Sequence, residues 1–252
     1  MKVIVTCGPS YEPIDQVRRL TNFSTGELGV MLSTELARAG HEVFCLKGSG
    51  ATHPGPDKPC HVSLFNTNDD LLKLLVQTAG AHEIGAVFHV AALCDYKIKH
   101  VTDEQGRSCD SPKIASRSGA LTIKLEPATK VIAQMRRLFP ASILVGWKYE
   151  LAGTREEALA KARKQIEENR MDACVVNGAA YGSSFGFCRP SAPIHEYESK
   201  TRLAQQLTNW LCAATGERTD DAMCPAESGL GVEERHAVQG NFTTTRAKQG
   251  AS

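Results

Sequence analysis

The chain has 252 residues, of which 29 are Lys or Arg and 28 are Asp or Glu. This length is enough for one α/β domain with a full core, and the nearly cancelling charges give no indication of a surface for nucleic acid or membrane. No apolar run approaches the ~20 residues of a membrane span, and Met1 and Lys2 lead into a strand-like run rather than a signal peptide. We therefore expect a soluble, cytoplasmic protein without nucleic-acid or membrane partners.

Predicted strands and helices alternate along the chain. Strand-like runs occupy 3–6, 42–48, 86–92, 142–147 and 172–177, and helical patterns occupy 26–39, 67–79, 128–138, 154–170 and 200–213. Continuous apolar runs are typical of strands buried on both faces of a parallel sheet, and Thr154 with Glu157 predicts a capping box. The alternation predicts a Rossmann-like, doubly wound α/β fold with helices on both faces of a mostly parallel sheet. Ligands of such folds bind at the carboxyl ends of the strands.

Three loops and the C-terminal stretch interrupt this order. The Gly/Pro-rich loop 48–60 is predicted to form only surface, and 178–193 is a second Gly-rich loop. The stretch 97–120 is too long for an ordinary connection, which favours a lid, an arm or disorder. After about residue 214 the hydrophobicity falls and periodicity ends, so we expect a folded domain over 1–213 and a disordered tail over 214–252.

The nine cysteines are scattered, without CxxC or mixed Cys/His spacing, and the eight histidines form no HxxxH pair. Cys45 and Cys174 lie inside apolar runs, where a reduced cysteine behaves as a small hydrophobic residue. The pattern indicates structural thiols in a reducing compartment and disfavours a zinc site built by the protein alone.

The first long loop, CGPSYEPIDQVRRLTNFSTGELG at 7–29, joins the first strand to the first helix. Such a loop presents free backbone N–H groups at a helix N-terminus, which favours phosphate. Two cations, Arg18 and Arg19, and three neutral hydrogen-bonding residues, Asn22, Ser24 and Thr25, strengthen this interpretation over an ordinary connection. The chain has no GxGxxG, GxxxxGK[ST] or GxSxG motif, which disfavours NAD-dependent, P-loop and serine-hydrolase chemistry.

Charged side chains also follow the later strands. Asp95 follows the third strand, Lys148 follows the fourth, Lys200 opens the last helix, and Lys113 lies in the long loop. Cations gathered with one acid that can hold Mg²⁺ predict a nucleoside triphosphate or another phosphorylated substrate. A turn aspartate at Asp95 and a solvated lysine at Lys113 are the alternative interpretations.

Several blocks then carry a family resemblance: GPSYEPIDQVRRLTNFSTGELG, AALCDYK, SPKI, LTIKLEPATKVI, VGWKYE, DACVVN and SKTRLA. In this order they resemble the phosphopantothenoylcysteine synthetase (phosphopantothenate–cysteine ligase) family, the ligase domain that bacteria often carry behind a flavin-dependent decarboxylase. The resemblance implies that 4′-phosphopantothenate is activated with CTP or ATP and Mg²⁺ and then joined to cysteine in coenzyme A biosynthesis. It also implies a homodimer, with 97–120 as a flap or dimer arm. The decarboxylase part is not present in this sequence, so no FMN is expected.

The resemblance gives individual residues a role. Asn22 matches the asparagine that stabilises the acyl-nucleotide, Lys113 the lysine needed for activation, and Asp95 the acid near nucleotide and metal. Together with the strand-end pattern, it predicts nucleotide contacts from Gly8, Ala91, Ala92, Asp95, Lys148 and Lys200. It likewise predicts phosphopantothenate contacts from Arg18, Arg19, Ser24, Thr25 and Gly26.

Departures from the family pattern gather on the predicted nucleotide side. Where the family usually has KIKK, this chain has KIAS, so Ala115 and Ser116 replace cations. The usual FAAET is replaced by WKYEL, which puts Lys148 at a normally small position. The usual ND is replaced by Asn177–Gly178, which lacks the acid. Two alternatives therefore stay open: a nucleotide-dependent ligase for another phosphorylated acid, and a non-catalytic nucleotide-binding paralogue.

Overall fold

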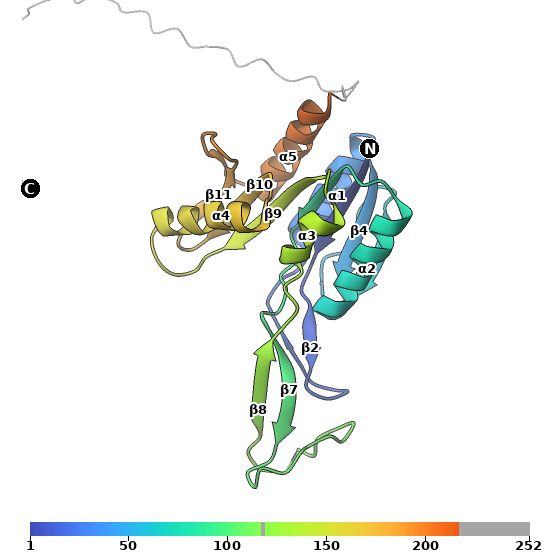
Figure 1. Cartoon of the computed structure of the whole chain (residues 1–252), viewed down its shortest axis with the longest axis vertical. Helices are drawn as coiled ribbons and strands as arrows, with labels where there is room; N and C mark the ends of the chain where they lie inside the picture. Colours follow the sequence, from blue (N-terminus) through green and yellow to red (C-terminus); the bar gives the residue numbers. More distant parts are fainter. Residues whose placement is uncertain (117–118, 217–252) are drawn as a thin grey trace, which may run out of the picture. The chain divides into compact units, whose positions relative to one another are not determined.

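The computed structural model describes residues 1–116 and 119–216, so the predicted tail lies outside the described residues except for its first three positions (Figure 1). Within that range an eight-stranded sheet has the order β12-β11-β10-β9-β6-β1-β4-β5. All five predicted strands belong to it: β1 (Lys2–Cys7), β4 (Glu42–Gly48), β6 (Ala86–His89), β9 (Ile143–Tyr149) and β10 (Ala173–Gly178). The remaining members are β5 (His61–Phe65), β11 (Gly182–Cys188) and β12 (His195–Tyr197).

The strand order confirms the doubly wound prediction. On one side of β1 lie β4 and then β5; on the other side lie β6, β9 and β10. All neighbouring strands in this part of the sheet are parallel. The β10–β11 and β11–β12 pairs, at one edge of the described sheet, are antiparallel. The order in which successive strands are added to the sheet reverses between β1 and β6, and open α/β sheets bind ligands at such a point.

Helices cover both faces of the sheet, as predicted. They are α1 (Glu27–Arg38), α2 (Asn68–Ala81), α3 (Ile132–Leu138), α4 (Arg155–Asn169) and α5 (Lys200–Thr215). Val3 and Val5 of β1 pack with α1 and α5, whereas Ile4, between them, packs with α2 and α3. Successive side chains of a strand point to opposite faces, so a strand covered on both faces reads as one continuous apolar run. The predicted capping box of Thr154 with Glu157 is confirmed at α4.

Two predicted loops contain strands. Part of 97–120 belongs to β7 (Tyr96–Thr102), which pairs with β8 (Thr122–Pro127) in a separate antiparallel ribbon, and β11 occupies part of 178–193. The ribbon projects from the sheet next to β2 (Tyr11–Pro13), which pairs with β3 (Arg19–Thr21) (Figure 1). Because the ribbon is largely exposed, its residues are mixed polar and apolar; Lys97 and Lys99 both pair with Glu126 across it. Such a sequence lacks the continuous apolar run of a buried strand.

Six of the eight cysteines in residues 1–116 and 119–216 are buried: Cys7, Cys45, Cys94, Cys174, Cys188 and Cys212. No group of three or more His, Cys, Asp or Glu side chains in this range is arranged to hold a metal ion. Nor is any helix there both long and apolar enough to cross a bilayer.

Candidate functional site

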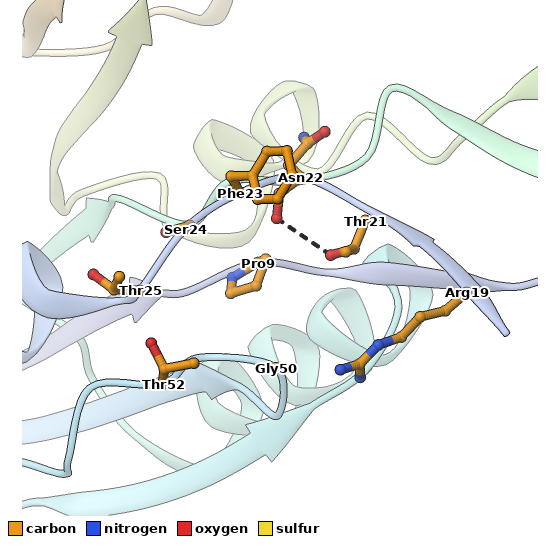
Figure 2. Close-up of a pocket in the computed structure, with 9 residues that line it drawn as sticks. All are labelled: Pro9, Arg19, Thr21, Asn22, Phe23, Ser24, Thr25, Gly50 and Thr52. Carbon is orange, nitrogen blue, oxygen red and sulfur yellow. Dashed lines mark hydrogen bonds between the residues drawn. The ribbon is translucent and has the colours of Figure 1, made fainter. Parts of the chain in front are cut away.

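A hollow of ≈ 380 Å³ lies beyond the carboxyl end of β1, between the loop that enters α1 and the loop that leaves β4 (Figure 2). Its lining residues are Pro9, Arg19, Thr21, Asn22, Phe23, Ser24, Thr25, Gly50 and Thr52. Four of the predicted site residues are therefore brought together: the cation Arg19, the amide Asn22, and the hydroxyls of Ser24 and Thr25. Figure 2 shows Thr25 and Thr52 on the same side of the hollow, with Arg19 at the other end.

Tight turns at Gly8 and Gly26 adjoin this hollow. Both residues have left-handed backbone conformations, with φ of 76° and 78°. A Cβ atom on Gly8 would lie 2.7 Å from the Ala51 methyl, and one on Gly26 would lie 3.0 Å from the same methyl. Only glycine fits a positive φ at so close an approach. The two predicted glycines therefore let three backbone segments meet beneath the site.

The loop after β4 takes part in the site, which corrects the prediction that 48–60 forms only surface. Gly50 and Thr52 line the hollow, and the backbone N–H of His53 donates to the carbonyl of Thr25 at 3.0 Å. Sequence reasoning missed these residues because their Gly/Pro-rich composition is also that of an ordinary surface loop. The contact with Thr25 links residues 28 positions apart and leaves no local pattern.

The ends of β1 and β6 stay joined beyond the strands, which places Ala91 and Ala92 beside the first loop. Pro9 and Ala92 form an isolated parallel bridge. The Ala92 N–H donates to the Gly8 carbonyl at 3.0 Å, and the Ser10 N–H donates to the Ala92 carbonyl at 3.2 Å. The predicted small residues thus lie between β1 and β6, where the order of strand addition reverses.

Asn22 connects the two strand ends. Its Nδ2 donates to the Leu93 carbonyl at 2.8 Å, which ties the loop entering α1 to the segment that follows β6. In Figure 2 the Asn22 side chain points away from Gly50 and Thr52. Asn22 is exposed, so its amide lies at an accessible boundary between the hollow and the residues after β6.

The two neighbouring arginines have different surroundings. Arg19 lines the hollow and its guanidinium carbon lies 4.8 Å from the centroid of the Tyr11 ring, a cation–π distance. Arg18 instead pairs with Asp15 at 3.0 Å and donates to the Ile114 carbonyl. Arg18 thereby connects the first loop to the segment that carries Lys113, whose own side chain is exposed.

The other predicted charges already have partners. Asp95 pairs with Lys130 at 3.4 Å, and both side chains are 71% exposed. Lys148 lies 3.2 Å from Glu150, whereas Lys200 at the start of α5 pairs with Glu27 at the start of α1. Neither Lys148 nor Lys200 lines the hollow.

The Lys200–Glu27 pair lies directly after Gly26. The hydrogen bond and the positive charge of Lys200 hold the pKa of Glu27 below its usual value. Lys200 therefore offsets a carboxylate at the N-terminus of α1, which is a different role from the direct anion contact expected from its position.

His89, at the end of β6, was missed by the sequence reasoning. Its Nδ1 lies 2.8 Å from the Thr6 hydroxyl oxygen, which also accepts the Ala91 N–H at 3.3 Å. Burial, with a smaller contribution from the positive charge of Lys130, lowers the pKa of His89 to about 4. A neutral histidine therefore lies directly under the backbone of the strand end. The available signal was one polar residue inside the apolar run AVFHVAA.

The chain is similar to known proteins. Residues 1–213 match the family described as DNA/pantothenate metabolism flavoprotein C-terminal domain. The coenzyme A biosynthesis bifunctional protein CoaBC of Thermococcus kodakarensis is 30% identical over 183 residues, which are 72% of this chain and 42% of that protein. The chain thus spans less than half the length of this relative.

Solved structures show the same fold. The DNA/pantothenate metabolism flavoprotein from Streptococcus pneumoniae has a TM-score of 0.75 and 24% identity, covering 85% of this chain and 99% of that one. A mutant of Cab2 in complex with phosphopantothenate-cysteine has a TM-score of 0.66 and 16% identity, covering 86% of each chain.

Proposed function

Because the chain belongs to the DNA/pantothenate metabolism flavoprotein C-terminal domain family, we propose that it is a phosphopantothenate–cysteine ligase of coenzyme A biosynthesis. The observation that carries this proposal is the family match over residues 1–213, together with an accessible Asn22 between the hollow and the end of β6. CoaBC of Thermococcus kodakarensis and the Cab2 complex with phosphopantothenate-cysteine support the choice of substrates.

The reaction has two steps. The carboxylate of phosphopantothenate attacks the α-phosphate of CTP or ATP; an O–P bond forms and pyrophosphate leaves. The cysteine amine then attacks the acyl carbon, a C–N bond forms, the nucleoside monophosphate leaves, and the ammonium proton passes to solvent. Neither step needs a covalent enzyme intermediate, so the residues contribute positioning and charge.

Asn22 is suited to the intermediate of this reaction. A neutral amide can donate a hydrogen bond to the acyl oxygen of the mixed anhydride without transferring a proton to it. Asn22 already holds the loop against Leu93, which restricts its backbone. We assign Asn22 to stabilisation of the acyl-nucleotide, and Lys113 to neutralising charge repulsion between the carboxylate and the α-phosphate.

The hollow suits the phosphopantothenate end of the intermediate. Arg19 offers a cation, and Ser24, Thr25 and Thr52 offer hydroxyl groups close to the start of α1. Helix N-termini with free N–H groups favour phosphate. The nucleotide would then lie over Ala91 and Ala92, where small side chains let it approach the backbone.

Mg²⁺ fits this site only together with the nucleotide. Asp95 is a single exposed carboxylate, and residues 1–116 and 119–216 contain no cluster of three or more His, Cys, Asp or Glu ligands. Magnesium is commonly held by one or two carboxylates plus substrate phosphates. Asp95 would hold the ion, which when bound would neutralise phosphate charge.

We also propose a cytoplasmic homodimer in which the 97–120 segment serves as a flap or arm. Cys7, Cys45, Cys94, Cys174 and Cys188 are free, buried thiols, which supports a reducing compartment. Ile123 and Leu125 of the β7–β8 ribbon are exposed by 39% and 41%, and Phe23 beside the hollow is fully exposed, which supports a partner surface here.

One experiment tests the function. The protein is incubated with phosphopantothenate, cysteine, Mg²⁺ and either CTP or ATP, and pyrophosphate and the amide product are measured. We expect both products with at least one nucleotide. Absence of pyrophosphate with either nucleotide contradicts the ligase and favours a non-catalytic relative. Pyrophosphate release that does not depend on phosphopantothenate favours a ligase for another acid.

A further inference from the structure

The carboxylate of Asp15 accepts three backbone N–H groups and forms one ion pair. Its side chain is only 1% exposed. One carboxylate oxygen accepts the backbone N–H groups of Val17 at 2.8 Å and Arg18 at 2.6 Å. The other accepts the N–H of Ile114 at 3.2 Å and pairs with the Arg18 guanidinium at 3.0 Å. A single carboxylate thus links two segments almost a hundred residues apart.

Further contacts reinforce this link. Arg18 donates to the Ile114 carbonyl, and the backbone N–H of Gln16 donates to the Pro112 carbonyl at 3.0 Å. Ile114 is 2% exposed, so its side chain anchors the segment as well. Residues on both sides of Lys113 are therefore fixed, while the Lys113 side chain itself stays exposed.

The electrostatics of this arrangement require an ionised carboxyl group at Asp15. Withdrawal from solvent raises the pKa of Asp15, but the N–H groups of Arg18, Val17 and Ile114 and the Arg18 charge outweigh it and hold the pKa below its ordinary value. Hydrogen bonds that involve an ionised group are stronger than neutral ones.

The chain connects these contacts directly to Asn22. The loop held by Asp15 continues through β3 (Arg19–Thr21) into Asn22, and β3 pairs with β2. Because residues 112–114 are fixed to residues 15–18, the position of Lys113 relative to Asn22 is fixed as well. Lys113 and Asn22 act in successive steps of the proposed reaction. We propose that Asp15 is a positioning residue that holds Lys113 for the activation step. This inference rests on the proposed function, because that function supplies the role of Lys113.

Asp15→Asn is the variant that tests it. The asparagine carbonyl oxygen can still accept the Val17 and Arg18 N–H groups, but the amide nitrogen cannot accept the Ile114 N–H. The matched control is Asp103→Asn. Asp103 accepts backbone N–H groups from Gln105 and Arg107 and pairs with Arg107, yet these contacts stay within one turn.

Two readouts separate this proposal from the proposed function. Hydrogen exchange at the Ile114 amide does not depend on catalysis; we expect it to accelerate at least about tenfold in Asp15→Asn, whereas core amides and Asp103→Asn keep wild-type rates. Pyrophosphate release should fall by about tenfold or more in Asp15→Asn. In the double variant with Lys113→Gln, release should be no lower than in Lys113→Gln alone, because residues that act as a unit are not additive.

Each outcome decides between the claims. If exchange at Ile114 stays at the wild-type rate, the link does not hold the segment and the proposal is wrong. If exchange accelerates but release in an active enzyme is unchanged, or if the losses from Asp15→Asn and Lys113→Gln simply add, positioning of Lys113 is refuted. Absence of release in the wild type contradicts the proposed function, and the role of Lys113 falls with it. Should Asp15→Asn fail to fold, Arg18→Met removes the donor to the Ile114 carbonyl and carries the same expectations.

Discussion

Acidification should destabilise the protein through His89. This side chain is buried, and its only hydrogen bond among those described joins Nδ1 to the Thr6 hydroxyl. The Thr6 hydroxyl can donate to Nδ1 while it accepts the Ala91 N–H, an arrangement that fits a neutral histidine with its proton on Nε2. Protonation of Nδ1 would remove this acceptor and bury a charge close to Lys130.

The size of the effect follows from the two pKa values. In the folded protein the pKa of His89 is about 4, against about 6.5 in an unfolded chain. On acidification the unfolded state therefore binds the proton first, and the free energy of unfolding falls as the pH drops below about 6.5 and stops falling below about 4. The complete loss is about 3 kcal/mol, of which about 2 kcal/mol is reached by pH 5.

Urea unfolding between pH 7.5 and pH 5, followed by tryptophan fluorescence, measures this loss. In His89→Gln the decrease in unfolding free energy over this range should be smaller than in the wild type by about 2 kcal/mol, whatever the stability of the variant at pH 7.5. The control is His100→Gln, since His100 is exposed on β7. If wild type and His89→Gln lose the same free energy, His89 is not the buried group that titrates.

Four further expectations concern single substitutions. Asn22→Asp should still release pyrophosphate but form the amide at least about tenfold more slowly, since the neutral donor is replaced by a charge; equal rates for both steps would remove Asn22 from this role. Lys113→Gln should reduce pyrophosphate release by about tenfold or more, measured with saturating nucleotide, and wild-type release would exclude Lys113. Gly178→Asp, which restores the acid usual in the family, should lower the free energy of unfolding by about 2–3 kcal/mol in urea titrations. Gly178 has φ of 110°, and its Cβ would lie 2.3 Å from the carbonyl oxygen of Glu150; unchanged stability would show that this turn adapts. Thr154→Ala should cost about 1 kcal/mol in the same assay through loss of the α4 cap, and a neutral effect would show that the cap contributes nothing.

The sequence predicted those strands that produce a recognisable local pattern of apolar residues. Strands covered on both faces appeared as continuous apolar runs and were found. By contrast β5 was not predicted, because this edge strand leaves Val62 and Leu64 exposed and lacks such a run. The β7–β8 ribbon was missed for the same reason.

The site, too, was predicted only in part. The loop 7–29 was found from its composition, but adjacent residues within it were not distinguished. Arg18 and Arg19 looked equivalent, yet Arg18 joins Asp15 and Ile114 while Arg19 lines the hollow. Which of two neighbouring cations faces a ligand depends on contacts with Ile114, almost a hundred residues away, and no local spacing contains that information.

The Ala51 methyl has a consequence for how sequences of this family diverge. It is the nearest group to the missing Cβ positions of both Gly8 and Gly26, although Ala51 itself does not line the hollow. A larger side chain at 51 would have to push the two glycine turns apart, whereas glycine would let them settle closer. The spacing of the two turns that adjoin the hollow therefore depends on the volume of a side chain outside it, and we expect exchanges at position 51 to change the size of ligand that the hollow accepts.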